Sequence, residues 1–389
     1  MSAKRMAKAD PDECREALAA IGEARSAEDL FAPINAPADY NLARGRFAEL
    51  SHLMHPEAVP AHLRDEAALA YGKLAMLYAA HTQNATDAAS HTHHIEIFAS
   101  RHYTYTVRDG AAFGGSDLNT SLYLAERSGA TETTSVVLHC STLTAARSAE
   151  AIEHETKILE ILTAKREAPA AAFYPRLLES AQLVGPNGTL TANALEGYLG
   201  TIDLANLRNH GYPDGLDLRA VAWIWRRLLF ALGHAHAAGI IHGALTPSAV
   251  RILAAEHGLV LTDWTCSYGG NLVPPLRPER AAIWPLGSVS MAYPDLWAPE
   301  VLTGAVPEPG ADIYMATRVM EWLMRPEDRI RPELRAFIAG CTLSAPALRP
   351  ANAFALLDEF NAILTDIFGE RTYTPLVLPA VAQPFVLSS

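Results

Sequence analysis

Apolar residues recur at helical spacing in two neighbouring stretches of the N-terminal part of the chain. Their members are Ala43, Phe47, Leu50 and Met54 in the first stretch and Leu63, Ala67, Ala70, Leu74 and Leu77 in the second. Pro56 and Pro60 lie between the stretches, where they end one helix and delay the start of the next. The spacing predicts a helical hairpin over residues 41–82, with a further Ala- and Glu-rich helix over 12–24 before it.

A change of pattern follows a small polar segment at residues 83–94, which has the composition of a linker. From about residue 95, the runs "IEIFASRHYTYTV", "TSLYLAER" and "TSVVLHCS" are short, β-rich and separated by turn residues. We therefore expect a small antiparallel sheet in this region.

Helical periodicity returns at about residues 147–164, where Ile152, Leu159 and Leu162 form an apolar stripe. Glu155 falls on the same stripe, and a carboxylate on a buried face needs a partner.

Three more helices are predicted further along the chain. Residues 219–237 form a long helix ended by Gly239, which suits a left-handed cap. Residues 311–324 are apolar on nearly every face and predict a buried helix, and residues 351–368 predict an amphipathic one. The whole pattern predicts an α+β protein.

Six segments follow from these changes of pattern. They are an N-terminal helical extension (1–26), a helical module (27–82), a linker (83–100), a small β-rich lobe (101–196), a larger α-rich lobe (197–370) and a Pro-rich apolar tail (371–389).

Composition and charge exclude several classes of protein. The chain has 389 residues, 50% of them hydrophobic, so it can build a large core. Its formal net charge of −12 argues against non-specific nucleic-acid binding and against an anionic membrane surface. There is no apolar run long enough to span a membrane, and we expect no signal peptide. The scattered cysteines predict reduced thiols and a cytoplasmic location, and the Ala- and Arg-rich usage is typical of bacterial coding.

The segments "HGALTPSAV" (242–250), "LVLTDW" (259–264) and "APE" (298–300) occur in the order and spacing of protein-kinase motifs. Over about residues 101–368 the chain resembles the protein-kinase family, and the resemblance implies a bilobal fold. The positions that match are Glu155 on the helix of the small lobe, Leu195 and Glu196 at the gatekeeper and hinge, His242, Asp263, Glu300, Asp312 and Arg349. The resemblance also implies that Arg349 pairs with Glu300.

Positions that carry phosphoryl transfer in the family are occupied by other residues here. Only Gly115 remains of the glycine-rich loop, in "GSDLNTSL", where Asp117 adds a negative charge. His139 stands for the strand lysine, Gly243 and Ala244 for the arginine and aspartate of H-R-D, Ala249 for the metal-binding asparagine and Thr265 for the glycine of D-F-G. Because the loss of one acid–base group alone costs about 10²–10⁴ in rate, the resemblance implies a pseudokinase that is not an enzyme and needs no cofactor.

Glu155 and Asp263 allow two interpretations. In the first, both have a structural role as hydrogen-bond acceptors, with Glu155 paired to His139 and Asp263 capped by backbone N–H groups. Alternatively, Asp263 binds a metal ion and nucleotide binds beside Leu195 and Glu196. The histidines at 91, 93 and 94 are either a metal site or solvated linker residues.

The segment 46–78 contains His55, Pro56 and Glu57 between two helical patterns. Residues 27–82 resemble a J-domain, whose H-P-D tripeptide lies between two helices and contacts a DnaK-type chaperone. Here Glu57 replaces the aspartate, which lengthens the side chain by one methylene, so we expect a degenerate module. A generic helical hairpin that contains His-Pro is the alternative.

Two functions are therefore expected. The first is a non-catalytic scaffold or regulator that binds proteins through the J-like hairpin, the Pro-rich segment 268–297 or the C-terminal tail. Trp284, Tyr293 and Trp297 lie in that segment, and a proline-rich loop loses less entropy on binding. The second is an atypical nucleotide-binding protein or metal-dependent transferase that uses Asp263 and Glu155.

Overall fold

The structure is a computed structural model of the whole chain. It describes residues 10–24, 26–31, positions within 46–77, 95–108, 120–130, 132–141, 146–164, 169–185, 188–269, 293–329, 331–370, 372–373 and 375–379. The chain divides into two compact units, Met1–His94 and Ile95–Ser389. Among the described residues, each hydrophobic cluster draws its members from one unit only.

Helix α1 (Pro11–Glu23) opens the first unit and confirms the helix expected over 12–24. It begins after Asp10, whose side chain accepts a hydrogen bond from the backbone N–H of Asp12 at 2.8 Å. Its buried face consists of Cys14, Ala17 and Ile21.

Ala43 lies outside the described residues, and the other members of the two apolar stripes face the same core as α1. Leu50 and Met54 of the first stripe are 1% exposed, and Leu74 of the second is fully buried. The Sγ of Cys14 donates to the carbonyl of Leu53 at 3.5 Å, and the second stripe begins at Leu63 in a short 3₁₀ turn, Ala61–Leu63. Helical spacing thus identified the buried side of this unit correctly.

The second unit begins with an antiparallel sheet, as the β-rich runs predict. Its strands are β1 (Ile95–Ala99), β2 (Thr104–Arg108), β3 (Thr120–Ser128), β4 (Thr133–Ser141), β5 (Arg176–Gly185) and β6 (Gly188–Glu196). They follow the order β1-β2-β3-β4-β6-β5 and close into a barrel through the pairing of Ala99 of β1 with Val184 of β5. The sheet therefore starts before residue 101, where the sequence pattern placed the lobe boundary.

Helix α4 (Ala146–Leu162) packs against β4, β5 and β6. Ile152 and Leu159 are fully buried, and Leu162 is half-buried, so the predicted stripe faces the sheet. Glu155 is fully buried on that same face.

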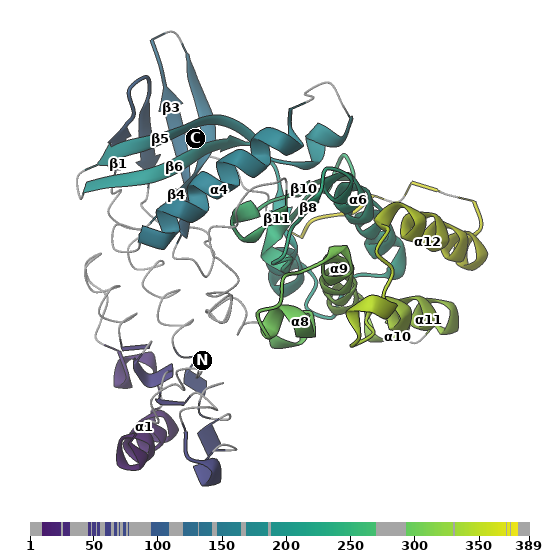
Figure 1. The fold of residues 1–389 in the computed structure, drawn as a ribbon, viewed down its shortest axis with the longest axis horizontal. Coiled ribbons are helices and arrows are strands. Elements are labelled where there is room, and N and C mark those ends of the chain that lie inside the picture. The colour runs from purple at the N-terminus through teal and green to yellow at the C-terminus, as the bar shows by residue number, and fades with distance from the viewer. Residues whose placement is uncertain are drawn as a thin grey trace. The chain divides into compact units, whose positions relative to one another are not determined.

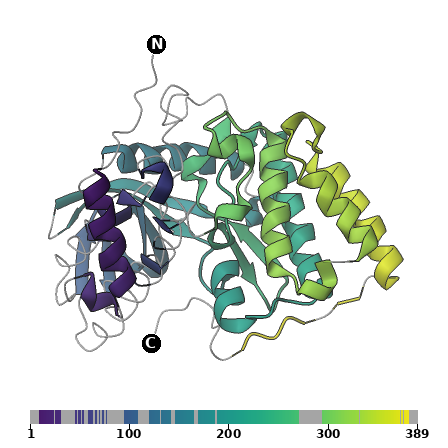
Figure 2. The same cartoon turned by 90° about the horizontal axis from the view of Figure 1, so that it is seen from below.

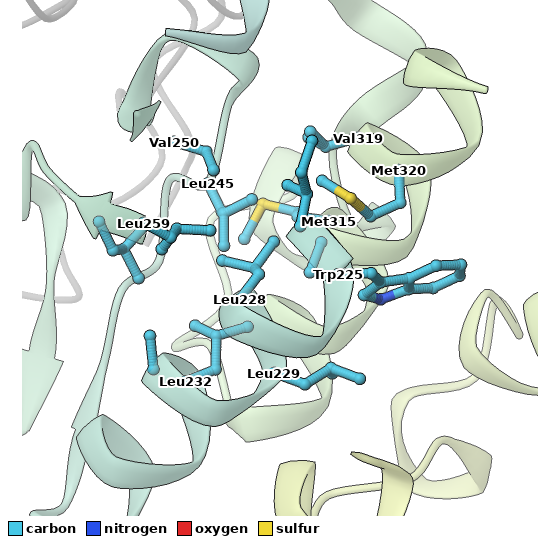
Figure 3. Packing of buried hydrophobic residues seen from close by; sticks show 14 of the residues in the cluster. Trp225, Leu228, Leu229, Leu232, Leu245, Val250, Leu259, Met315, Val319 and Met320 are labelled. Atoms are coloured by element: carbon cyan, nitrogen blue, oxygen red, sulfur yellow. The ribbon is translucent and has the colours of Figure 1, made fainter. Parts of the chain in front are cut away.

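Two long helices form the centre of the remaining chain. Helix α6 (Leu218–Ala237) begins after Asp217, which accepts from the N–H of Arg219 at 2.9 Å, and it ends before Gly239, whose φ is +72°. Helix α9 (Pro309–Leu323) is buried on most of its surface, as predicted. Figure 3 shows side chains from both helices meeting those of nearby strands, with Leu228 of α6 close to Met315 of α9.

Helix α12 (Ala353–Phe368) lies along α6, as Figures 1 and 2 both show. Helix α11 (Pro332–Cys341) packs on α9 and α12, where Trp225 of α6 meets Phe337 and Phe360 at ring-centroid distances of 5.3 and 4.7 Å. The shorter elements are α5 (Leu204–Asn206), α8 (Pro299–Leu302), α10 (Pro326–Arg329), β7 (Ile202–Asp203), β8 (Ile240–Ile241), β9 (Val250–Leu253), β10 (Gly258–Leu261) and β11 (Tyr268–Gly269).

The content of helices and sheet confirms the α+β class. In the part of the chain that the structure describes, no helix has the length and hydropathy needed to cross a membrane. Cys14, Cys140, Cys266 and Cys341 are buried, and none of them forms a disulfide bond.

Candidate functional site

His139 and Glu155 form a buried pair where β4 faces α4. Nδ1 of His139 lies 2.8 Å from Oε2 of Glu155, and Nε2 lies 2.9 Å from the hydroxyl of Thr120 on β3. Asn193 of β6 donates to the same carboxylate oxygen at 3.1 Å, and the backbone N–H of Trp264 donates to Oε1 at 3.3 Å. The pair expected from the sequence is present, and every polar atom of both side chains has a partner within the protein.

The pKa values of this pair move in opposite directions. Burial by itself lowers the pKa of His139, but the charge of Glu155 and the hydrogen bond between them raise it above its ordinary value. Burial likewise raises the pKa of Glu155, while His139, Asn193 and the N–H of Trp264 bring it below its ordinary value. Both shifts favour an imidazolium paired with a carboxylate.

Asp263 follows β10 and has a left-handed backbone, with φ of +61° and ψ of +67°. This conformation is uncommon for a residue other than glycine. Its half-buried carboxylate accepts from the hydroxyl of Thr265 at 2.6 Å. The expected capping by backbone N–H groups is wrong, since Asp263 makes no capping bond to the turn Trp264–Cys266 and the N–H of Trp264 points to Glu155 instead.

The turn at residues 242–244 is held by Asp312 of α9. The carboxylate of Asp312 accepts from the backbone N–H groups of His242 and Gly243 at 2.8 and 2.9 Å, and Nε2 of His236 lies 2.9 Å from it. Burial raises the pKa of Asp312, but His236 and these hydrogen bonds bring it below its ordinary value. Ala244, which follows in the turn, is 8% exposed.

The ring of His242 packs inside the domain. Its Nε2 lies 2.9 Å from the carbonyl of Thr262, and its ring meets that of Trp264 edge-on at 4.7 Å. Thr262 in turn donates from its backbone N–H to the carbonyl of Ala249 at 2.8 Å. Gly243 has a φ of +78°, and a Cβ there would lie 2.7 Å from the carbonyl oxygen of Cys266, so only glycine fits this backbone.

Glu300 and Arg349 form the ion pair that the sequence predicts. Both carboxylate oxygens of Glu300, in the first turn of α8, bind the guanidinium at 2.5 and 2.9 Å. The guanidinium also lies 4.6 Å from the ring of Tyr314 on α9. This two-pronged contact joins α8 to the segment before α12.

Leu195 and Glu196 end β6, and the two differ in exposure. Leu195 is fully buried, whereas Glu196 is exposed and forms an ion pair with Arg176 of β5. The chain that follows β6 contacts Arg251 of β9 through two side chains. The guanidinium of Arg251 lies 5.4 Å from the ring of Tyr198 and 3.3 Å from the carboxylate of Asp203. Arg251 is only 5% exposed.

Several candidate residues lie outside the described residues. They are Gly115 and Asp117 of the glycine-loop position, His55, Pro56 and Glu57 of the J-like motif, His91, His93 and His94, and Trp284. Within the described part of the chain, no group of three or more His, Cys, Asp or Glu side chains, Asp263 included, is placed to hold a metal ion.

Three buried polar residues of this region were not singled out from the sequence. His154 lies beside Glu155 on α4, with Nε2 2.9 Å from the carbonyl of Ser267. Asn193 binds Glu155, and Arg251 binds Asp203. For Arg251 a signal exists in "AVRIL", where one charge stands among apolar residues of a short β-run.

Comparisons with known proteins give a structural likeness only. No family model and no curated protein matches the sequence. Among solved structures, a double mutant of the Mycobacterium tuberculosis PknI kinase domain is similar at 19% identity and a TM-score of 0.45, over 68% of this chain and 96% of that chain. The PknI kinase domain without mutations gives 18% identity and a TM-score of 0.44, over 68% and 97%. Because both the sequence identities and the TM-scores are this low, neither an activity nor a ligand of the PknI kinase domain is assigned to this chain.

Proposed function

We propose that residues 95–370 form a protein-kinase-like domain that does not transfer phosphate, and that the protein acts as a scaffold or regulator by binding other proteins. The carrying observation is the burial of His139 and Glu155, which are 1% and 0% exposed. At this position a kinase needs a cation directed at the phosphates. Here both ring nitrogens of His139 are hydrogen-bonded inside the domain, one to Glu155 and the other to Thr120, so neither is directed at a phosphate.

Two further positions support the same proposal. Ala244 and Ala249, at the places of the catalytic aspartate and the metal-binding asparagine, are 8% and 2% exposed and offer only methyl groups. A methyl group can neither accept the proton of a substrate hydroxyl nor bind a metal ion.

The segment after β6 adds a third line of support. The resemblance places a nucleotide base beside the hinge at Leu195 and Glu196. The chain that follows packs Tyr198 and Asp203 around the buried guanidinium of Arg251. We propose that this internal ion pair takes up room that a bound nucleotide would need, and that ATP is not a ligand.

The contacts that are retained support the proposed scaffold role. The ion pair of Glu300 with Arg349 and the bonds from Asp312 to residues 242 and 243 maintain the fold without any reactive group. We propose that partners bind through the J-like hairpin, the segment 268–297 or the tail 371–389. We propose that the J-like hairpin is degenerate and does not stimulate the ATPase of a DnaK-type chaperone. Stimulation by the parent chain that is lost in His55→Gln would contradict this.

Thermal shift and label transfer test the proposal on the full chain. With ATP or GTP, with or without Mg²⁺ or Mn²⁺, we expect no change in the unfolding midpoint and no transfer of labelled phosphate to the chain or to a generic protein substrate. An active kinase assayed in parallel validates the reagents. Metal-dependent phosphate transfer would refute the proposal.

A second candidate function rests on Asp263. Its left-handed backbone is a strained conformation of the type found at functional sites, and its carboxylate is half-buried rather than enclosed. This observation favours a nucleotide- or metal-binding role without transfer. A metal-dependent stabilisation by nucleotide that Asp263→Ala abolishes would establish it. Thr303→Ala, which changes an exposed hydroxyl near the end of α8, serves as the control.

A further inference from the structure

A pocket lies between α6, α12 and the chain that follows α12. Its volume is about 250 Å³. The residues that line it are Arg219, Ala222, Trp223, Arg226, His257, Leu364, Phe368, Gly369, Glu370, Thr372 and Tyr373. None of them belongs to the region of His139, Glu155 and Asp263, so the pocket is a separate feature of the domain.

Aromatic rings stacked across distant parts of the chain form one wall. The rings of Trp223 and His257 are nearly parallel, with centroids 4.3 Å apart and an interplanar angle of 3°. Tyr373 stacks on the other face of His257 at 4.3 Å, and its hydroxyl donates to the carbonyl of Ala255 at 2.9 Å. Because these contacts join α6, the turn before β10 and the segment after α12, the wall is built before any ligand arrives.

Two arginines of α6 make the lining positively charged. The guanidinium of Arg219 lies 4.2 Å from the ring of Phe368, and Nε of Arg226 donates to the side chain of Asn361 at 2.7 Å. Among the described residues that line the pocket, Glu370 alone carries a carboxylate. The chain as a whole has a net charge of −12, so this local excess of positive charge is not a general property of the protein.

Trp223 provides an independent indication of a ligand. Its side chain lines the pocket although the residue is only 5% exposed, and its indole Nε1–H has no hydrogen-bond partner in the structure. A buried donor without an acceptor is unfavourable, and native proteins normally supply a partner. The N–H is enclosed beside the pocket, and a small displacement of the indole brings it to an acceptor on a bound molecule.

We infer that this pocket binds a small organic oxyanion, a carboxylate or a phosphate. Guanidinium groups bind both by charge-assisted, paired hydrogen bonds. The indole N–H adds one neutral donor, and the rims of the aromatic rings contact the organic part of the ligand. The volume limits the ligand to a small molecule or to one side chain of a larger one. This inference does not depend on the proposed absence of phosphate transfer.

Isothermal titration of the full chain with three matched probes tests the inference. Phenyl phosphate and benzoate carry the two oxyanions on the same ring, and benzyl alcohol is the neutral control. We expect saturable binding at one site for at least one anion and none for benzyl alcohol. The stronger of the two anions then identifies the oxyanion that the pocket prefers.

Four variants locate the site. Arg219→Gln is expected to weaken binding about tenfold or more, because a charged hydrogen bond is lost. Trp223→Phe replaces the indole by a smaller aromatic ring without an N–H, and it is expected to weaken binding several-fold. Glu370→Gln is expected to strengthen binding by removing a repulsive charge. Arg335→Gln, on the exposed face of α11, is the matched control and should bind like the parent chain.

Absence of saturable binding by both anions would refute the inference. So would an Arg219→Gln variant that binds like the parent chain, or an equal loss in Arg335→Gln. Thermal unfolding of each variant ensures that only folded protein is compared. If Trp223→Phe does not fold, the Arg219→Gln variant tests the inference by itself. Arg219 is exposed, and its guanidinium lies over the ring of Phe368, so we expect this substitution to leave the fold intact.

Discussion

The imidazole of His139 and the carboxylate of Glu155 are both buried, and the raised pKa of His139 and the lowered pKa of Glu155 favour the charged form of each. Taking two charges out of water is unfavourable, and their attraction compensates only when the geometry is good and the remaining polar atoms are bound. Thr120, Asn193 and the N–H of Trp264 meet that requirement. Removal of one partner therefore leaves an uncompensated charge inside the domain.

Folding stability should depend on pH through this pair. Glu155 has a pKa below its ordinary 4.5, so its contribution is present above pH 4.5 and is lost as the pH falls through the lowered pKa. His139 has a pKa above its ordinary 6.5, so its contribution is full below pH 6.5 and is lost as the pH rises through the raised pKa. The contribution of the pair is therefore largest between these two ordinary values.

Denaturant unfolding of His139→Gln and the parent chain at a series of pH values measures the effect. We expect the variant to lose about 3 kcal/mol inside this window, because a buried pair is broken, and less at higher pH. His102→Gln, which changes an exposed histidine, should show no such profile. A loss that stays constant as the pH rises well above the ordinary pKa of histidine would show that the pair is not charged.

This pair was predictable from the sequence, whereas part of its surroundings was not, for a physical reason. Glu155 lies on an apolar helical stripe, which signals burial and the need for a partner. The N–H of Trp264 that binds Glu155 comes directly after Asp263, whose left-handed backbone no periodicity encodes. The sequence pattern therefore did not indicate that this N–H binds Glu155 and does not cap Asp263.

At the scale of elements, α4 is joined to the turn Trp264–Cys266 and the residue after it by two adjacent side chains. Glu155 accepts from the N–H of Trp264, and His154 lies 2.9 Å from the carbonyl and 3.2 Å from the hydroxyl of Ser267. Burial lowers the pKa of His154, so this ring is neutral at pH 7 and donates its Nε2–H to the carbonyl. The position of α4 is thereby tied to the segment that contains Asp263.

Loss of the His154 contact should loosen that connection. We expect His154→Ala to cost about 1–2 kcal/mol and to raise hydrogen exchange at the backbone N–H of Trp264 about tenfold or more, because the turn opens more often. Exchange followed by mass spectrometry measures this directly. Glu153→Ala, on the exposed face of α4, is the control, and an equal increase in both variants would contradict the expected role of His154.

Helices and strands were predictable from the sequence where their apolar residues recur at a clear spacing. The helices α4, α6, α9 and α12 have clear apolar stripes or continuous apolar surfaces, and all were expected close to their observed bounds. The hairpin of β5 and β6 was not expected. The burial of β5 does not alternate cleanly, and a register shift occurs between Leu177 and Glu179.

At the scale of the whole molecule, the described hydrophobic residues form separate cores in the two units. Leu74 is fully buried in the core of the first unit, and Leu228 is fully buried in the core of the second. The polar composition of residues 83–94 indicated a division of the chain there, and the second unit begins at Ile95. Composition is informative at this scale because a segment without large apolar residues contributes little to either core.

Two matched substitutions in the full chain should therefore affect different unfolding transitions. Leu74→Ala and Leu228→Ala each remove a buried leucine side chain and should each cost about 2–5 kcal/mol. Because each core is confined to one unit, we expect each substitution to lower the midpoint of one calorimetric transition and to leave the other in place. The isolated segment 95–389 should retain the transition that Leu228→Ala lowers. A single transition that both substitutions shift equally would show that the two units unfold together.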